Sequence, residues 1–311
     1  MKVFAPNYYK DFHCIADKCR HSCCIGWEID IDPETMSKYN SVCGEFGTRL
    51  KCGIKNENGI DSFILGENER CPFLNQKGLC DIITELGEDH LSQICTDHPR
   101  FRNFFSDREE LGLGLCCEEA CRIILSKKEK TVLEIIEDDG EDIELYDDEK
   151  VILAFRERLF DLVQDRSQRL EERINSILEL FGISLDEEAI CKCLTAFADM
   201  EIMDSSWRDI TDKLTTAHIL SDFVPDFDIP YEQLLVYFIY RHIPESEDMS
   251  DLAARVSFAV LSVRIINGIY KMLNAENKPD FELLCDVCRM YSSEIEYCEE
   301  NIEKMKALIS E

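Results

Sequence analysis

The sequence has few basic residues for its number of acidic ones. It contains 34 Lys and Arg against 64 Asp and Glu, which gives a formal net charge of −30. A surface with that excess of negative charge repels a phosphate backbone, so nonspecific nucleic-acid binding is excluded. Anionic lipid attracts basic rather than acidic segments. We therefore expect neither a nucleic-acid nor a membrane partner.

Long apolar runs are also missing. No stretch approaches the ~18 uninterrupted apolar residues of a membrane span, and the best candidate, residues 252–273, is broken by Arg255, Arg264 and Lys271. The first residues lack the apolar region and the small-residue cleavage site of a signal peptide. These absences predict a cytoplasmic protein, in a compartment that keeps thiols reduced.

Glycine and proline are scarce and unevenly placed. Of the 13 glycines, ten precede residue 122, and no proline lies between Pro99 and Pro225. The first part is therefore rich in turns. Within it, residues 27–32 alternate apolar and polar side chains as a short strand does. Asp32 and Pro33 then form the cap and first position of a predicted short helix.

The second half has a different pattern of apolar and polar residues. Apolar residues recur at helical spacing and predict helices near 151–178, 186–200, 205–220, 231–242, 250–273 and 279–309. Residues 134–149 hold ten carboxylates in sixteen positions, which favours a solvated linker or hairpin. We predict a mainly α protein with an irregular, cysteine-rich metal-binding module and short β elements at 1–130, an acidic linker at 131–150, and an α-helical bundle at 151–311.

The cysteines are the unusual feature, because 12 of 17 precede residue 122. Thiolates two to four residues apart can converge on one metal. Soft thiolates favour zinc, cuprous copper or iron–sulfur clusters, and a cubane cluster takes four of them. The clustered cysteines exceed four, so some are spares, surround the ligands without binding the metal, or bind a second metal. The groups are Cys14-x4-Cys19-x3-Cys23-Cys24; Cys71, Cys80 and Cys95; and Cys116, Cys117 and Cys121.

Some nearby residues have simpler interpretations. A free cysteine packs as a small apolar residue, and we expect burial for Cys43, Cys52, Cys191, Cys193, Cys285, Cys288 and Cys298. His13, His21 and His98 flank the cysteine groups, where a hydrogen-bonded structural role is favoured over ligation. Arg100 and Arg122 either neutralise a thiolate cluster or form ordinary salt bridges.

These motifs resemble one family. Cys14-x4-Cys19-x3-Cys23-Cys24-x2-Trp27 is followed by Cys71-Pro-Phe-Leu, Gly78-Leu-Cys80 and Leu91-Ser-x2-Cys95-x2-His-Pro-Arg. This order resembles the flagellin lysine-N-methylases, which belong with the cysteine-cluster proteins that chelate zinc or iron. The stretch from Leu235 to Arg241 is similar to the same family. Cys116-Cys117-Glu118-Glu119-Ala120 departs from the family's Ser-Cys-Pro-Glu-Ala, and Cys121 is an additional cysteine.

The resemblance implies a bacterial enzyme that methylates surface lysines of flagellin with S-adenosylmethionine and carries an iron–sulfur cluster, of the 4Fe-4S type, with zinc as the alternative metal. The ligands that it implies are Cys14, Cys19, Cys23, Cys24, Cys71, Cys80, Cys95 and Cys117.

The sequence itself supports methyl transfer less directly. Gly112-Leu113-Gly114 is the nearest match to a glycine-rich cofactor turn, and close packing is the favoured explanation for it. Aromatic faces can hold a sulfonium by cation–π attraction, so we predict Tyr237, Tyr240 and Arg241 as cofactor-binding residues, against the alternative of an aromatic face buried in the bundle. The sequence names no catalytic residue.

Two other functions remain open. A noncatalytic protein could use the metal to stabilise a domain that is poor in core residues, and a redox protein would need the cluster but no methyl donor. An acidic surface suits a lysine-bearing partner, because complementary charge raises the rate of encounter.

Overall fold

The computed structural model describes residues 1–141, 143–275 and 278–309. Residue 142 of the predicted linker and residues 276–277 and 310–311 of the predicted bundle lie outside this range. The chain divides into two compact units. The main unit comprises residues 1–12 and 101–311, and the insertion unit comprises residues 13–100.

A four-stranded sheet ties the start of the chain to the main unit. Its strand order is β5-β6-β1-β7. Strand β1 runs parallel to β6, with Lys2 opposite Arg108, and antiparallel to β7, with Pro6 opposite Leu133. The strands are β1 (Lys2–Pro6), β5 (Arg100–Phe104), β6 (Arg108–Leu113) and β7 (Leu133–Asp138).

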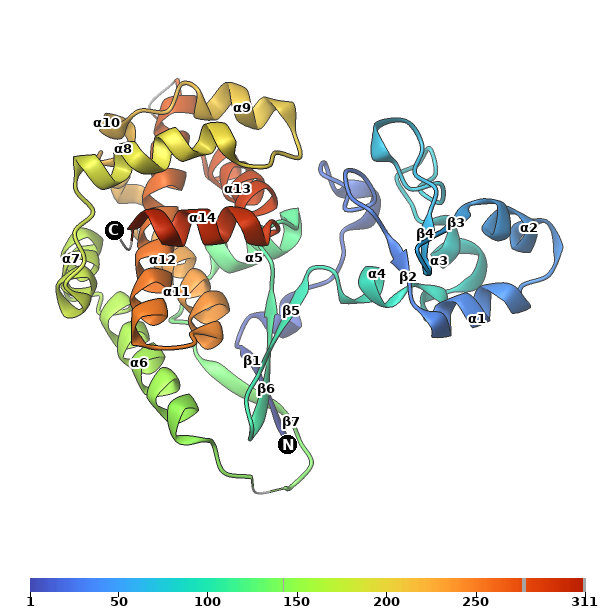
Figure 1. Ribbon diagram of the computed structural model, residues 1–311, viewed down its shortest axis with the longest axis horizontal. Coiled ribbons are helices and arrows are strands. Elements are labelled where there is room, and N and C mark those ends of the chain that lie inside the picture. Colours follow the sequence, from blue (N-terminus) through green and yellow to red (C-terminus); the bar gives the residue numbers. More distant parts are fainter. Residues whose placement is uncertain (142, 276–277, 310–311) are drawn as a thin grey trace. The chain divides into compact units, whose positions relative to one another are not determined.

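Helices make up the rest of the main unit (Figure 1). Most residues of α11 and α12 are buried, so these two helices form its centre. By length and composition alone α12 could cross a membrane, but its apolar window is packed inside the unit. The helices are α5 (Glu118–Ser126), α6 (Asp147–Val163), α7 (Leu170–Phe181), α8 (Glu187–Ala196), α9 (Ser205–Thr211), α10 (Thr216–Ile219), α11 (Asp228–His242), α12 (Met249–Leu273), α13 (Phe281–Tyr291) and α14 (Glu299–Ile309), with a π-helical turn at Ser292–Glu296.

The insertion unit has its own small core. A three-stranded sheet of order β2-β4-β3 packs with short helices around Tyr39, Leu50, Phe63 and Phe73. The Asp32 carboxylate accepts a hydrogen bond from the Thr35 N–H (2.9 Å), which confirms the predicted cap. The elements are β2 (Asp30–Ile31), β3 (Ile54–Glu57), β4 (Ile60–Phe63), α1 (Pro33–Ser41), α2 (Gly44–Cys52), α3 (Asp81–Leu86) and α4 (Gln93–Asp97).

The predicted mainly helical class is confirmed, with differences in detail. The unit boundaries fall at residues 12/13 and 100/101 rather than near 130 and 150, because β1 pairs with strands from beyond residue 100. Part of the predicted linker is strand β7, which adds to the sheet. The predicted helix at 279–309 is interrupted by the π turn, and the predicted strand at 27–32 is reduced to Asp30–Ile31.

Gly112 on β6 makes room for an aromatic side chain. A Cβ atom at this position would lie 2.0 Å from Cζ of Phe101. Within Gly112-Leu113-Gly114, the ring of Phe101 lies against Gly112. Close packing, the explanation that we favoured from the sequence, therefore accounts for this glycine.

Gly112→Ala should destabilise the main unit by about 1–3 kcal/mol, because the ring must move or the strand must shift. Urea unfolding measures the loss. Gly66→Ala is the control, since its Cβ would meet nothing nearer than 3.5 Å. Adding Phe101→Ala to Gly112→Ala should cost no more than Phe101→Ala alone. Equal stability of Gly112→Ala and wild type would contradict the packing argument.

Candidate functional site

Four of the predicted thiols gather in the insertion unit. The Cys71 N–H donates to the Cys24 carbonyl (2.9 Å), which brings the first two cysteine groups together. Cys80 pairs with Leu74 in an isolated β-bridge, and Cys95 lies on α4. All four side chains pack in or against the same small core. Segments distant in sequence thus bring four cysteines to one small hydrophobic core.

These thiols affect one another electrostatically. Burial raises the pKa of Cys71 to about 12 and that of Cys95 to about 11, with Cys24 and Cys80 adding to both shifts. A hydrogen bond with Cys23, with further help from Ser22 and Arg70, lowers the pKa of Cys24 to about 7. Cys24 therefore forms a thiolate most readily of these four.

The other predicted ligands are placed elsewhere. Cys14 and Cys23 are exposed and Cys19 is partly buried, all in the insertion unit, whereas Cys117 is the N-cap residue of α5 in the main unit. Across the residues that the structure describes, no three His, Cys, Asp or Glu side chains are arranged to hold a metal ion.

The remaining cysteines divide into two groups. Cys193, Cys285 and Cys288 are buried as expected, and the Cys121 thiol donates to the Cys285 carbonyl (3.5 Å) in the core of the main unit. The predicted burial was wrong for three others, because they lie on exposed positions of short helices or at their caps. These are Cys43, Cys52 and Cys191. Cys298, for which burial was also predicted, is only partly buried.

The main unit buries a second polar group, which we call the Glu296 cluster: Tyr237, Arg241, His242 and Glu296. The Tyr237 hydroxyl donates to the Glu296 carboxylate (3.1 Å) and accepts from the Arg241 guanidinium (2.8 Å). Nε2 of His242 lies 2.8 Å from the same carboxylate. Glu296 ends the π-helical turn, and such turns occur frequently at functional sites.

The charges of this cluster follow from its contacts. Burial alone would raise the pKa of Glu296, but the Arg241 charge and the hydrogen bond from His242 lower it below its ordinary value. Burial lowers the pKa of His242, which Glu296 offsets in part. Burial also opposes the charge of Arg241, yet Tyr237 and Glu296 keep its pKa raised. The cluster therefore contains a carboxylate, a guanidinium and a neutral imidazole.

The cluster reaches the surface at Arg241 and Tyr297. The Arg241 guanidinium lies 4.8 Å from the ring centroid of Tyr297 and 5.1 Å from that of Phe101. Tyr297 is 45% exposed, and the Arg241 side chain is 13% exposed. Cys116 lies beside Tyr297 and forms a hydrogen bond with it. A partly accessible cation between two aromatic rings can bind a carboxylate, while the rings can attract a second cation.

The structure separates the predicted cofactor-binding residues. Tyr237 and Arg241 meet in the Glu296 cluster, but the Tyr240 hydroxyl donates to the Leu111 carbonyl (2.9 Å), and its ring lies near Arg156. Glu296, His242 and Tyr297 are not among the residues predicted from the sequence. No signal singled out Glu296 and Tyr297, because Glu294-Ile295-Glu296-Tyr297 continues an ordinary helical pattern.

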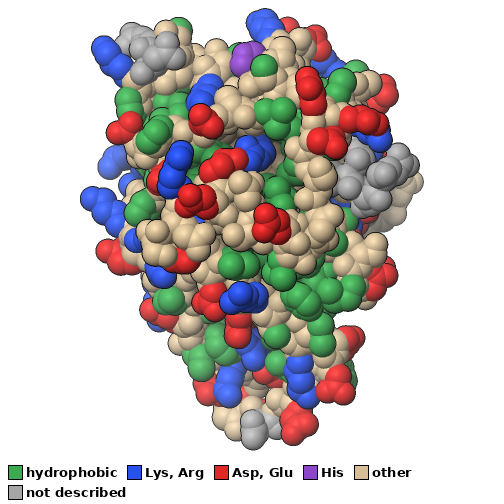
Figure 2. Space-filling view, turned by 90° about the vertical axis from the view of Figure 1, so that its left-hand side faces the viewer, with side chains coloured by type: hydrophobic (Ala, Val, Ile, Leu, Met, Phe, Trp, Pro, Cys, Tyr) green, Lys and Arg blue, Asp and Glu red, His purple; other side chains and the backbone are tan. Residues whose placement is uncertain are grey.

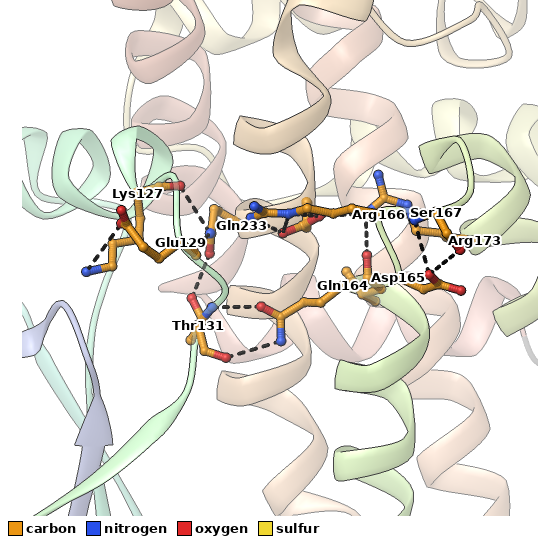
Figure 3. A network of polar contacts seen from close by, with 11 residues as sticks. Lys127, Glu129, Thr131, Gln164, Asp165, Arg166, Ser167, Arg173 and Gln233 are labelled. Carbon is orange, nitrogen blue, oxygen red and sulfur yellow. Dashed lines mark hydrogen bonds and ion pairs between the residues drawn. The ribbon is translucent and has the colours of Figure 1, made fainter.

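A polar cavity of about 350 Å³ lies at the end of α5. Its lining combines Arg122, Lys127 and Lys128 with Asp11 and Glu129. Buried side chains hold the loop that carries the lysines, since Nε2 of Gln233 donates to the carbonyls of Lys127 and Glu129 (Figure 3). Opposite charges nearly balance, so the lining favours neither anions nor cations.

Comparison with known proteins identifies the main unit. A family model described as "FliB lysine N-methylase C-terminal domain" matches residues 101–311. The chain belongs to the FliB lysine N-methylase family. The match contains Phe101, Arg241 and Glu296, so the Glu296 cluster lies within the family's domain.

Relatives within the family are distant. Two proteins named lysine-N-methylase, from Salmonella choleraesuis and Salmonella typhimurium, are each 28% identical over 146 residues, which cover 42% of this chain and 36% of theirs. The flagellar biosynthetic protein FliU of Salmonella muenchen is 27% identical over 137 residues, covering 42% of this chain and 81% of FliU. The aligned region thus spans about a third of the two methylases. No solved structure matches this family member.

The stability of this FliB-family chain should fall in acid. Folding lowers the pKa of His242, so the contribution of His242 to stability is complete above the ordinary histidine pKa of ~6.5 and is lost as pH falls below it. The pKa of Glu296 is also lowered, but its contribution is lost only below the ordinary glutamate pKa of ~4.3. Urea unfolding at about pH 7.5 and about pH 5.5 measures the loss. The decrease in unfolding free energy between the two pH values should be smaller by about 1 kcal/mol in His242→Gln than in wild type. A control, His218→Gln, should behave like wild type. Equal losses in His242→Gln and wild type would contradict the assignment.

Proposed function

We propose that this chain transfers methyl groups from S-adenosylmethionine to lysine side chains of a flagellar protein, flagellin, in the bacterial cytoplasm. The family assignment and the names of the relatives support this proposal. The observation that carries it is the Glu296 cluster, which places a partly accessible Arg241 between two aromatic rings inside the matched domain.

The donor set of the cluster fits the methyl donor. When bound, S-adenosylmethionine supplies a methyl group on a positively charged sulfur. Arg241 donates to Tyr237 through one nitrogen and has its Nε 3.6 Å from Glu296. Because a guanidinium has five N–H groups, its other edge can hold the cofactor's carboxylate in a fork. Tyr297 and Phe101 offer ring faces to the sulfonium.

Glu296 acts on Arg241 rather than on the lysine proton. Its lowered pKa makes it a weak base at neutral pH, while its negative charge and its bond to Tyr237 fix the orientation of Arg241. Tyr237 is buried behind Arg241 and positions the guanidinium. Tyr240, which contacts Phe101 at 5.8 Å between ring centroids, supports one of the two rings.

The proposal also includes an iron–sulfur cluster, held by cysteines of the insertion unit. Cys24, Cys71, Cys80 and Cys95 fit an iron–sulfur cluster in the kind and number of their donors, because four thiolates hold a cubane. They pack around one core, and each raised pKa includes repulsion from a neighbouring thiolate. Binding would require the thiols to approach one another. Bound there, the cluster would tie the four thiol-bearing segments of the insertion unit to one another.

The net charge of −30 favours attraction of a lysine-bearing substrate. On the face that Figure 2 shows, however, acidic, basic and apolar side chains are interspersed. General attraction by net charge therefore has to be combined with a specific contact, since complementary charge mainly raises the encounter rate.

Arg241→Lys should weaken binding of S-adenosylmethionine at least tenfold, because lysine keeps the charge beside Glu296 but lacks the fork that holds a carboxylate. Calorimetric titration measures the affinity, and transfer of a labelled methyl group to flagellin measures the activity. The control is Arg158→Gln on the exposed side of α6. Unchanged affinity in a folded Arg241→Lys protein would contradict the proposed cofactor site, and absence of methyl transfer by wild type would contradict the function.

The metal is tested by purifying the chain without oxygen and assaying it for iron, sulfide and zinc. We expect about four irons and four sulfides per chain. Cys71→Ser and Cys95→Ser should lose the metal, because each removes one of four ligands, whereas Cys43→Ser on an exposed position should retain it. One zinc per chain would contradict the iron–sulfur cluster, and equal metal content in Cys71→Ser and wild type would contradict the ligand set.

A further inference from the structure

Strand β7 has an open edge, and an acidic segment leads from it to α6. We call residues 132–141 and 143–148, which include β7, the acidic arm. Strand β7 pairs with β1 on one side, and no described strand pairs with its other side. Alternate residues of an edge strand point their N–H and C=O groups away from the sheet. The arm therefore offers a row of backbone donors and acceptors to an added strand.

Apolar side chains on the arm are exposed to solvent. Ile135 on β7 is 51% exposed, and Val132, Ile143 and Tyr146 are similarly or more exposed. Carboxylates separate them along the sequence. These carboxylates are Glu134, Glu137, Asp138, Asp139, Glu141, Glu144, Asp147 and Asp148.

The beginning of the arm is held firmly. Thr131, which precedes it, donates from its N–H to Oε1 of Gln164, the C-cap residue of α6 (2.7 Å), and accepts at its carbonyl from Nε2 of the same residue (3.1 Å). Its hydroxyl donates to Oε1 of Gln233 on α11 (2.6 Å). All three residues are buried, and Figure 3 shows their bonds in one network.

The end of the arm is held as well. Glu149 on α6 accepts from the N–H of Ser106 (2.8 Å) and from the N–H of Tyr146 (2.9 Å), so the arm returns to the β5–β6 turn. Because both ends are fixed, the edge of β7 needs little ordering before a partner pairs with it, and ordering is a main cost of binding.

We propose that the acidic arm docks an extended, lysine-rich segment of the protein substrate, which adds a strand to the outer edge of β7. The choice of partner rests on the proposed function. In an added strand, backbone bonds supply affinity and alternate side chains supply specificity. Side chains alternate along a strand, so Glu134 and Glu137 lie on the face of Ala5 and Val3, and Ile135 lies on the face of Phe4. Lysines of the segment meet the carboxylates on the first face, and apolar residues meet Ile135 on the second.

Charged residues on a free edge also protect proteins from aggregation, and this role predicts no specific partner. The two explanations differ for peptides of equal charge. The probe is a labelled ten-residue peptide of alternating lysine and valine, measured by fluorescence anisotropy. Its comparison peptide alternates lysine and proline, which keeps the charge but lacks half of the N–H donors.

The lysine–valine peptide should bind at least tenfold more tightly than the lysine–proline peptide, and a glutamate–valine peptide should not bind. Added salt should weaken binding, because exposed charges are screened. Equal binding of the two lysine peptides would overturn the proposal, since charge alone would then explain the interaction.

Ile135→Asn should weaken binding of the lysine–valine peptide about tenfold. The matched control is Ile60→Asn, an exposed isoleucine on β4 of the insertion unit (55% exposed). Equal effects of the two substitutions would overturn the proposal. Peptide binding needs no methyl donor. If the protein binds the peptide at β7 but methylates no lysine, this result contradicts the proposed function and leaves the docking inference intact. Unchanged flagellin methylation by Ile135→Asn contradicts the docking inference alone.

Discussion

The pairing of β1 with both β6 and β7 is the constraint on which the rest of the structure depends. The first strand of the chain lies between strands that come from beyond residue 107, so the main unit closes only after the insertion unit has been passed. The sheet places β6 against α11, where the Tyr240 hydroxyl donates to the Leu111 carbonyl. Leu115, just beyond β6, donates its N–H to the Tyr237 hydroxyl of the Glu296 cluster. It also leaves β7 at an edge, where the acidic arm begins.

Paired charges inside the main unit fix the orientation of its central helix. Glu232, Tyr237 and Arg241 all lie on α11 and each bonds to a group on another element or to the Glu296 carboxylate. A buried charge is costly unless it is paired, so rotation of α11 would leave several groups unsatisfied at once. This requirement, beyond apolar packing, holds Arg241 between its two rings.

The sequence was informative where one physical signal dominates. Helical spacing predicted α11 and α12, and Asp32-Pro33 predicted the start of α1, because these depend on local patterns. The unit boundaries could not be predicted, since pairing of Lys2 with Arg108 is a contact between distant segments. Cys24, Cys71, Cys80 and Cys95 were named as candidates, but spacing could not separate them from Cys14 or Cys117. Glu296 was one carboxylate among 64 acidic residues, and only folding distinguishes it.

The family's domain, as its sequence match defines it, begins at residue 101, whereas the folded main unit also needs residues 1–12. A gene fragment cut at residue 101 would encode β6 and β7 without the strand between them, and would leave the backbone N–H and C=O groups of two strand edges unpaired and open to other chains. By contrast, residues 13–100 form one continuous segment, which leaves the main unit after Phe12 and returns to it at Phe101. Evolution could therefore exchange or lose that insertion while keeping the sheet, provided that the short first strand is inherited with the remainder.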